Sequence, residues 1–402
     1  MSRPATAHFA PGRIEVLGKH TDYAGGDVLV CAVDRGVTAT VLPADAGMTA
    51  TSTAVADEVD LASDEDLPRG HWGRYVRTVV ERLRANFGPL QPCRIEVDST
   101  LPLASGMSSS SALVVATAMA LIRHHGFDES PLWRENITDE VQLAGYLACI
   151  ENGRTYGTLA GRGGVGTLGG SEDHTAMICS RSGELGHFSF NPPGLVRRVA
   201  FPDDLAFVVL VSGVAAEKTG AALEGYNRAS LRATEVLRRW NDAGHDHLHL
   251  GAALASGPGA VDELTALVAD DAVLAERLHQ FVRESTVIVP QSVDALARGD
   301  RDVFAALVAE SQSLAAGGLH NQVPQLEALV QLATRLGAVA SSSFGAGFGG
   351  SVWALVPASG ATQFADDWLA EYREQFPQEA ASAVTLVTRP SGPARPVEAV
   401  AR

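Results

Sequence analysis

A short run near the N-terminus, from Pro11 to Gly26, holds the side chains best suited to chemistry. Within eleven positions it contains Arg13, Lys19, His20, Asp22 and Tyr23. A strand-like apolar run at 28–33 follows it. Hydrogen-bond donors and acceptors so placed at a strand-to-strand turn suit the binding of a small polyhydroxylated molecule. The alternative is a solvated hairpin, which needs glycine and aspartate but not arginine, histidine and tyrosine together.

A second segment, 101–113, is rich in serine and lies between a strand-like run at 94–97 and an apolar helical pattern at 110–125. It therefore begins a helix, where free backbone N–H groups and the positive end of the helix dipole bind phosphate. Serine hydroxyls can also ligate Mg²⁺. Simple N-capping is the alternative, but it needs only one serine. No GxxxxGK[ST] pattern occurs, so this is not a P-loop.

Two later segments supply a carboxylate and a flexible backbone. The segment 166–174 carries Asp173 after three glycines, at 166, 169 and 170. The segment 341–351 has four glycines within six residues, which permit positive φ and close backbone approach. A bulged hairpin is its alternative reading.

The elements that position these segments follow from hydrophobic periodicity. The first half predicts strands at 28–33, 37–42 and 94–97 and helices at 72–87, 110–125 and 140–151. The second half predicts a strand at 205–213, helices at about 219–240, 260–270, 273–285, 291–298, 301–316 and 322–336, and two strands around 345–350. Asn191–Gly194 is rich in proline and indicates a domain junction. The tail from Ser391 is expected to fray.

Length and composition set the class of protein. The 402 residues suffice for two domains. A net charge of −16 argues against nucleic acid or an anionic membrane as a partner. Four scattered cysteines predict buried free thiols in a reducing cytosol. No signal-peptide pattern and no apolar run of ~18 residues occur, so we expect a cytoplasmic protein.

These motifs together resemble a known family. The run Pro11–Gly26 closely resembles the galactokinase signature of the GHMP kinase superfamily, and 101–113 resembles the superfamily's ATP loop. Gly-Ala-Gly-Phe-Gly-Gly-Ser at 345–351 matches its third motif. The segment 166–174 resembles the galactokinase segment that carries the catalytic aspartate, with strict matches at Gly170 and Asp173 alone. The resemblance spans about residues 5–360.

The resemblance implies a fold and an activity. The fold is α+β, with an N-terminal domain at 1–195 of ribosomal-protein-like fold and a C-terminal ferredoxin-like domain at 196–402, and the nucleotide and sugar bind between them. The activity is ATP- and Mg²⁺-dependent phosphorylation of a monosaccharide at its anomeric 1-hydroxyl, by a monomer or weak dimer. A non-catalytic sugar and ATP sensor is the competing class.

The resemblance also implies roles for individual residues. Asp173 is the catalytic base and Arg13 the charge stabiliser. The sugar-binding set is Lys19, His20, Asp22, Gly170 and Tyr226. The nucleotide-binding set is Gly106, Ser108, Ser109, Ser110, Ser111 and Gly347. The Mg²⁺ ligands are Ser110 and Glu151, and Glu151 could instead be a solvated helix residue.

The chain departs from the family at two places. Lys19 stands where galactokinases have a glutamate that accepts a hydrogen bond from the sugar's C6 end. Because an ammonium donates and attracts anions, the acceptor could be a uronic acid such as galacturonate or glucuronate, with Arg162 and Lys218 adding charge. Alternatively, Lys19 pairs with Glu15 or Asp22 and the sugar is neutral. The glycine-rich insertion 152–165 is either a lid over an altered pocket or a surface loop.

Overall fold

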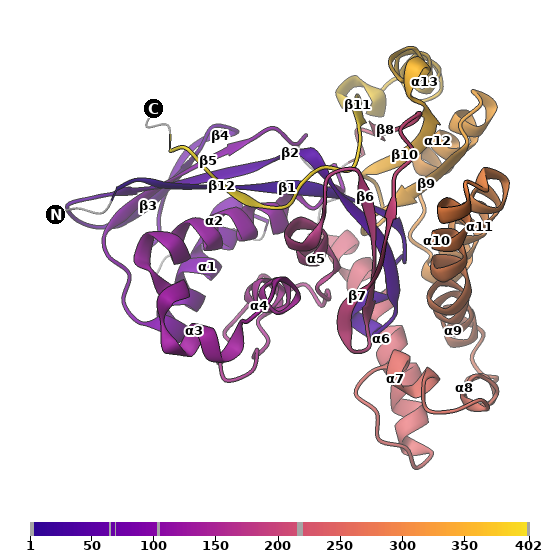
Figure 1. The fold of residues 1–402 in the computed structure, drawn as a ribbon, viewed down its shortest axis with the longest axis horizontal. Helices are drawn as coiled ribbons and strands as arrows, with labels where there is room; N and C mark the ends of the chain where they lie inside the picture. Colours follow the sequence, from indigo (N-terminus) through magenta and orange to yellow (C-terminus); the bar gives the residue numbers. More distant parts are fainter. Residues whose placement is uncertain (1–3, 64–65, 69, 103–104, 215–219, 400–402) are drawn as a thin grey trace.

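Two lobes, each built on its own sheet, make up the chain (Figure 1). The computed structural model describes residues 4–63, 66–68, 70–102, 105–214 and 220–399. The first sheet lies above a layer of helices on the left of Figure 1, and the second sheet lies on the right beside a column of helices. The predicted α+β class with two lobes is confirmed.

The first sheet contains the strands that carry the N-terminal motif. Its order is β12 (Arg395–Val397), β1 (Thr6–Leu17), β2 (Asp27–Pro43), β5 (Cys93–Ser99), β3 (Met48–Ser52) and β4 (Val55–Asp60). The pairs are antiparallel except β3 with β5. The start of β2 also pairs with β6 (Glu184–Phe190), which pairs with β7 (Pro193–Ala200). The two strands predicted at 28–33 and 37–42 are thus one long strand.

Helices cover the lower face of this sheet in Figure 1. They are α1 (Trp72–Phe87), α2 (Ser109–His125), α3 (Pro131–Asn136), α4 (Glu140–Asn152) and α5 (Glu172–Cys179). The short helix η2 (Phe127–Glu129) links α2 to α3. Helix α2 is buried along nearly its whole length, with Ala112–Ala118 enclosed on every side. Its small and branched apolar residues therefore fix the serine-rich segment against the sheet.

The second sheet is buried on both faces. Its antiparallel order is β11 (Val384–Thr388), β8 (Leu205–Val211), β10 (Ser351–Pro357) and β9 (Ala340–Phe344). Even-numbered residues of β8 pack with α12 (Pro324–Arg335) and α13 (Ala361–Gln375), whereas Phe207, Val209 and Val211 join the core of the first lobe. This alternation follows from the two-residue period of a strand. One hydrophobic cluster consequently extends across both lobes, and a second lies between this sheet and the helices α12 and α13.

The remaining helices form the outer part of the second lobe (Figure 1). They are α6 (Gly220–Asp242), α7 (Leu250–Leu254), α8 (Ala260–Leu267), α9 (Ala272–Arg283), the π-helical turn η3 (Glu284–Ile288), α10 (Val289–Arg298), α11 (Arg301–Leu314) and the π-helical turn η4 (Ala315–Leu319).

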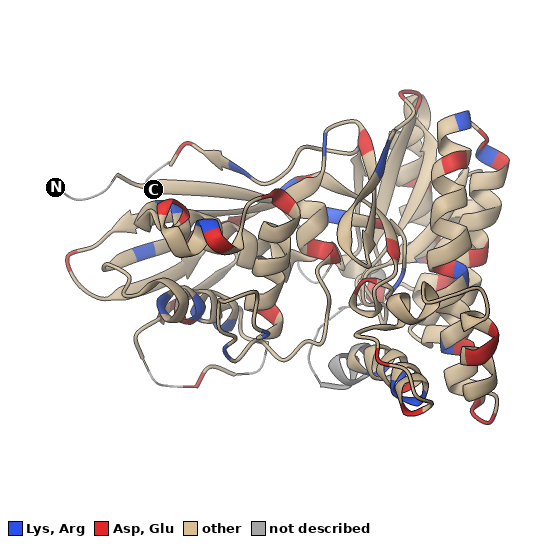
Figure 2. Cartoon of the chain, turned by 60° about the horizontal axis from the view of Figure 1, so that its bottom comes forward, with Lys and Arg blue, Asp and Glu red and all other residues tan. Residues whose placement is uncertain are grey.

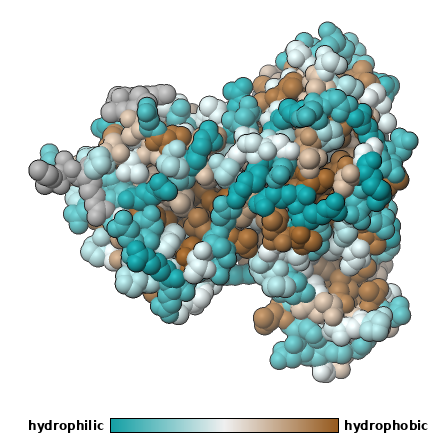
Figure 3. Space-filling view, in the orientation of Figure 1, coloured by the Kyte–Doolittle hydropathy of each residue, from teal (hydrophilic) through white to brown (hydrophobic). Residues whose placement is uncertain are grey.

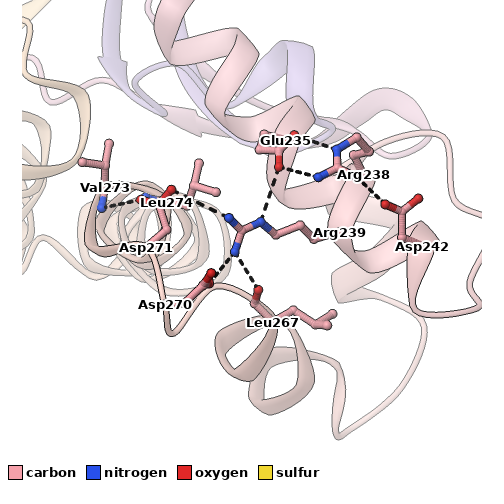
Figure 4. A network of polar contacts seen from close by, with 9 residues as sticks. All are labelled: Glu235, Arg238, Arg239, Asp242, Leu267, Asp270, Asp271, Val273 and Leu274. Carbon is pink, nitrogen blue, oxygen red and sulfur yellow. Dashed lines mark hydrogen bonds and ion pairs between the residues drawn. The ribbon is translucent and has the colours of Figure 1, made fainter.

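Figure 4 shows how Arg239 joins α6 to its neighbours, with Nη1 donating to the carbonyl of Leu267 at 3.1 Å and to Asp270 at 2.5 Å. Such exposed contacts contribute little to stability individually.

Acidic and basic residues alternate over the outer helices of both lobes rather than gathering in one basic patch (Figure 2). The visible face is largely hydrophilic, with apolar residues gathered towards its middle (Figure 3). None of the described helices combines the length and apolar character required to cross a bilayer. The four cysteines are free, as predicted, and Cys149 is only half-buried.

Two local expectations, the junction at 191–194 and the frayed tail, are wrong. Asn191–Gly194 is the turn of the β6–β7 hairpin rather than a domain junction, because β7 pairs with β6 in register. The expected boundary at 195/196 therefore falls inside β7. The tail from Ser391 is ordered up to 399: the amide of Ser391 donates to the carbonyl of Ala32 at 2.9 Å, and β12 pairs with β1. The strands β3, β4, β6, β7, β11 and β12 and the helices α3, α5, α7 and α13 were not predicted.

Candidate active site

A cavity of about 190 Å³ lies where the expected motifs meet. Its walls come from β1, the short helix η1 (Asp22–Ala24), the ends of α1, α2, α4 and α5, and the loop between β9 and β10. Predicted site residues that line it are Arg13, His20, Asp22, Gly106, Ser108, Ser109, Ser110, Ser111, Glu151, Gly170 and Asp173. The structure thus brings together residues from distant parts of the sequence, such as Arg13 and Asp173, which are 160 positions apart.

Arg13 and Asp173 form the centre of this cavity. Arg13 points inward from β1, and its Nε and Nη2 each lie 2.7 Å from Oδ1 of Asp173 in the first turn of α5. Its Nη1 donates to the carbonyl of Gly106 at 2.7 Å. Burial alone would lower the pKa of Arg13, but the negative charges of Asp173 and its neighbours raise it. The guanidinium therefore stays charged and connects the candidate base to the serine-rich segment.

The serine-rich segment opens α2 towards the cavity. Ser108 adopts a left-handed conformation with φ 55°, and its side chain makes no capping hydrogen bond to α2. Simple N-capping therefore does not account for the serines. Ser111 Oγ donates to Glu151 Oε2 at 2.8 Å and lies 3.4 Å from Asp173 Oδ2. The helix start, the acidic end of α4 and the candidate base thus converge.

The residues expected to hold Mg²⁺ share the cavity. Ser110 and Glu151 both line it, although Glu151 contacts the hydroxyl of Ser111 rather than that of Ser110. Among the described residues, no group of three or more His, Cys, Asp or Glu side chains is arranged to hold a metal. Mg²⁺ at phosphate sites typically uses one or two carboxylates together with substrate oxygens and water. One buried carboxylate beside serine hydroxyls fits that requirement.

The loop after β1 links the two lobes. His20 has φ 57°, its Nδ1 lies 3.1 Å from Tyr23 Oη, and its Nε2 lies 3.3 Å from the carbonyl of Ala346. Asp22 Oδ2 accepts a hydrogen bond from the amide of Glu172 at 3.0 Å, and burial raises the pKa of Asp22. His20 is therefore fixed against the loop between β9 and β10, and Asp22 is fixed against the start of α5.

Gly170 leaves room for the Asp22 carboxylate. A Cβ atom at Gly170 would lie 2.4 Å from Asp22 Oδ2 and 2.8 Å from the amide nitrogen of Tyr23. We therefore expect Gly170→Ala to displace Asp22 and, if the expected sugar is the substrate, to lower its kcat/KM by about tenfold or more. Gly163→Ala is the matched control, because a Cβ there meets nothing within 4 Å. Equal steady-state kinetics for the two variants would contradict this role.

Comparisons with known proteins agree with this geometry. Residues 2–43 match the model described as the galactokinase galactose-binding signature. Residues 74–158 match the GHMP kinases N terminal domain, and residues 292–374 match the GHMP kinases C terminal model. The chain belongs to the GHMP kinases.

Solved structures of similar fold cover this GHMP kinase over nearly its whole length. A galactokinase of Lactococcus lactis complexed with galactose superposes with a TM-score of 0.78 at 22% identity, covering 98% of this chain and 95% of its own. The Lin0012 protein of Listeria innocua superposes with a TM-score of 0.63 at 15% identity, covering 98% of this chain and 100% of its own. The L. major mevalonate kinase in complex with R-mevalonate superposes with a TM-score of 0.56 at 18% identity, covering 97% of this chain and 98% of its own.

Lys19 of this GHMP kinase does not line the cavity. Its side chain is 1% exposed, and Nζ donates to Ser311 Oγ on α11 at 3.0 Å. Ser311 Oγ donates in turn to Glu284 Oε1 at 2.9 Å, and that oxygen also accepts from the amide of Gly18 at 2.7 Å. The ammonium is therefore turned into the second lobe, with Ser311 rather than Glu15 or Asp22 as its hydrogen-bond partner. The reason for expecting an anionic sugar disappears.

Other predicted residues lie elsewhere. Gly345 and Ala346 line the cavity, whereas Gly347 packs against Asn321, whose carbonyl would lie 2.5 Å from a Cβ there. The side chain of Tyr226 lies outside the described residues, as does Lys218. The next residue, Asn227, is described, and its Oδ1 accepts from the amide of Leu168 at 3.1 Å.

The glycine-rich insertion is anchored to the helices of the first lobe. Leu159 is 1% exposed, and the carbonyl of Ala160 accepts from Asn86 Nδ2 on α1 at 3.1 Å. The Arg162 side chain is 57% exposed and lies 3.6 Å from Glu81. Of the segment 152–165, Asn152 is the part that lines the cavity. These contacts favour the surface-loop alternative over a lid.

Sequence reasoning missed four titratable residues that line the cavity: Glu15, Tyr75, Glu172 and His174. Glu15 is two residues from Arg13 on β1, so strand alternation could have placed it on the same face. His174 Nε2 lies 3.3 Å from Glu151 Oε2. Burial raises the pKa of Glu15 to about 7, against the opposing effect of Arg13 and Lys19. Burial, reinforced by the charge of Glu15, holds the pKa of Glu172 well above its usual range.

The raised pKa of Glu15 predicts how stability depends on pH. Since its pKa rises from 4.5 to about 7 on folding, the folded state binds the proton more tightly, and stability is lost as pH rises from 4.5 to 7. A shift of that size costs up to about 3 kcal/mol above pH 7. We therefore expect Glu15→Gln to raise the free energy of unfolding at pH 8 and to change it little near pH 5. Urea unfolding at both values tests this, and an equal effect at both would contradict it.

Proposed function

We propose that this GHMP kinase is an ATP- and Mg²⁺-dependent sugar kinase that phosphorylates a monosaccharide at the anomeric 1-hydroxyl. One observation carries the proposal. Oδ1 of Asp173 lies 2.7 Å from Arg13 Nε, and its Oδ2 lies 3.4 Å from Ser111 Oγ at the start of α2. A carboxylate is thus held directly between a fixed cation and a phosphate-binding helix start.

The proposed reaction uses these groups in fixed roles. The sugar hydroxyl oxygen forms a bond to the γ-phosphorus of ATP, the bond from that phosphorus to the bridging oxygen breaks, and ADP leaves with the electron pair. Asp173 accepts the hydroxyl proton. Arg13 holds Asp173 in place and offsets the negative charge on the transferring phosphoryl group. The backbone N–H groups at Ser108–Ser111 bind the phosphates, because the helix start leaves them free.

Mg²⁺ would be held by Glu151 and a serine hydroxyl of this segment together with phosphate oxygens. When bound, it neutralises phosphate charge and orients the γ-phosphoryl group. The contacts that Glu151 makes with Ser111 and His174 orient its carboxylate at the edge of the cavity.

The sugar side of the proposal rests on the N-terminal loop. Residues 2–43 match the galactose-binding signature, and His20, Asp22 and Gly170 line the cavity next to Asp173. Tyr226 remains a predicted sugar contact. A hexose of galactose configuration is therefore the first acceptor to test.

The test is ADP release by the purified full chain with ATP, Mg²⁺ and a panel of hexoses. Release that requires a sugar, with the phosphate at C1 by NMR, supports the proposal. Binding of sugar and ATP without turnover would instead establish the sensor function.

Galacturonate belongs in the same panel, which is measured with the wild type and with the Lys19→Met variant. Because Lys19 is turned away from the cavity, we expect this substitution to leave the ratio of galacturonate to galactose unchanged.

A further inference from the structure

One face of α9 and the turn η3 holds the loop after β1, residues 18–23. This face carries Arg277, Gln280 and Glu284, which are spaced three and four residues apart. All three side chains are fully buried and none of them lines the cavity, so their polar atoms contact the chain rather than a ligand. Glu284 Oε1 accepts from the amide of Gly18 at 2.7 Å, which fixes the start of the loop.

Gln280 and Arg277 supply donors to the next two residues of the loop. Gln280 Nε2 donates to the carbonyl of Lys19 at 3.0 Å, and Arg277 Nη2 donates to the carbonyl of His20 at 2.7 Å. None of the described backbone amides donates to either carbonyl. Since a buried carbonyl without a donor is costly, these two side chains are needed to keep this part of the loop in its buried conformation.

The backbone of His20 depends on this support more than its neighbours do. Its φ of 57° lies in the left-handed region, which residues other than glycine adopt at an energetic cost. In this conformation the imidazole lines the cavity, and its Nε2 lies 3.3 Å from the carbonyl of Ala346. Loss of the donor to the His20 carbonyl would let the backbone relax and would displace the imidazole from the cavity wall.

Arg277 also acts on the ring of His20 through Tyr23. The same Nη2 atom lies 3.2 Å from Tyr23 Oη, and Oη lies 3.1 Å from His20 Nδ1. Because an arginine only donates, Oη accepts from it and directs its own hydrogen to Nδ1. Burial raises the pKa of Tyr23 to about 12, so the hydroxyl keeps that hydrogen at neutral pH. The carbonyl of Ala346 only accepts, so Nε2 carries the ring hydrogen and both ring nitrogens have defined roles.

We propose that Arg277 and Gln280 are positioning residues for the sugar side of the cavity. They fix the backbone of Lys19 and His20 from the second lobe, and Arg277 also orients the His20 ring through Tyr23. Neither contacts the reacting atoms. The inference rests on the proposed sugar-kinase function, although one of its two tests needs no turnover.

The first test measures steady-state kinetics of the full chain with ATP, Mg²⁺ and galactose. Arg277→Met and Gln280→Met retain long side chains and remove the donors. Because His20 belongs to the sugar side and the serine-rich segment to the ATP side, each variant should raise KM for galactose about tenfold or more and leave KM for ATP unchanged. A merely structural role would reduce the active fraction, which lowers kcat and changes neither KM.

The second test is hydrogen–deuterium exchange of residues 17–26 in the full chain without ligand. Both variants remove hydrogen bonds that hold this segment, so its exchange should become about tenfold or more faster while the rest of the first lobe keeps its wild-type rates. A uniform acceleration over the whole chain would contradict the positioning role. Gln280→Met removes no charge, so it carries both tests if Arg277→Met does not fold.

Arg82→Met is the matched control, because Arg82 is also a buried arginine that does not line the cavity. It is 1% exposed, and its Nε donates to Asn86 Oδ1 at 2.8 Å within α1. This variant should lose stability but keep the wild-type KM for galactose and the wild-type exchange of residues 17–26.

Two kinetic results overturn the inference and leave the kinase proposal intact. One is a wild-type KM for galactose in both Arg277→Met and Gln280→Met, and the other is an equal rise of that KM in Arg82→Met. If no sugar supports ADP release, the kinase proposal fails and the exchange measurement decides the inference. Selective acceleration at residues 17–26 then upholds it, and unchanged exchange there overturns it.

Discussion

Asp173→Asn should lower kcat for sugar phosphorylation by at least ~10²-fold, the contribution typical of a general base. Asparagine keeps an oxygen that can accept from Arg13, which lies 2.7 Å away, so the fold around the cavity should be retained. It cannot take a proton at neutral pH. Steady-state ADP release, with ATP affinity and thermal stability measured in parallel, separates lost chemistry from lost structure.

The matched control is Asp27→Asn, which also neutralises a partly buried aspartate of the first lobe, outside the cavity. We expect turnover close to that of the wild type in this control. Near-normal turnover in Asp173→Asn itself would refute the assignment of the base.

Glu284→Ala should cost about 1–3 kcal/mol of folding stability or more, because it leaves the Gly18 amide and the Ser311 hydroxyl without their buried acceptor and removes a negative charge near Lys19. Glu284 is fully buried and connects through Ser311 to Lys19, which is 1% exposed. It also accepts the amide hydrogen of Gly18, so the sugar-binding loop loses an anchor. Urea unfolding measures the loss, and KM for the sugar should rise with it.

A double-mutant cycle isolates the charge. Glu284→Gln keeps an acceptor for Gly18 and Ser311 but removes the negative charge, so it should destabilise less than alanine. Adding Lys19→Met to Glu284→Gln removes the unpaired positive charge and should restore part of the stability. Strictly additive effects of Lys19→Met and Glu284→Gln would show that the two charges do not interact.

The residues that meet in the candidate active site could be predicted because each lies in a dense local motif. Arg13, the serines before α2 and Asp173 each combine a reactive side chain with glycines or a helix start, and the family resemblance ordered them in space. The direction in which the Lys19 side chain points could not be predicted. It depends on Ser311, which lies 292 positions further along the chain, and no local pattern reports such a contact.

Other features of the structure are only weakly indicated by the sequence. Proline and glycine at Asn191–Gly194 are compatible with a linker or a hairpin turn, and only the pairing of β6 with β7 decides between them. The spacing of Trp368 and Tyr372, four residues apart on α13, could have indicated a buried helix face. Glu15 was detectable from its alternation with Arg13, but only its burial shows that it belongs to the cavity.

The pairing of β12 with β1 constrains the order in which this protein can fold during synthesis. Residues 7–9 pair with residues 395–397, so β1 receives this partner only after β12 has been synthesised. Contacts of such sequence separation slow folding, because the intervening chain must be ordered first. Until then, one edge of β1 presents unpaired backbone groups that can pair with another chain. The first lobe is therefore completed only after residues 395–397 have been synthesised, and its exposed edge is the point at which a chaperone has most to protect.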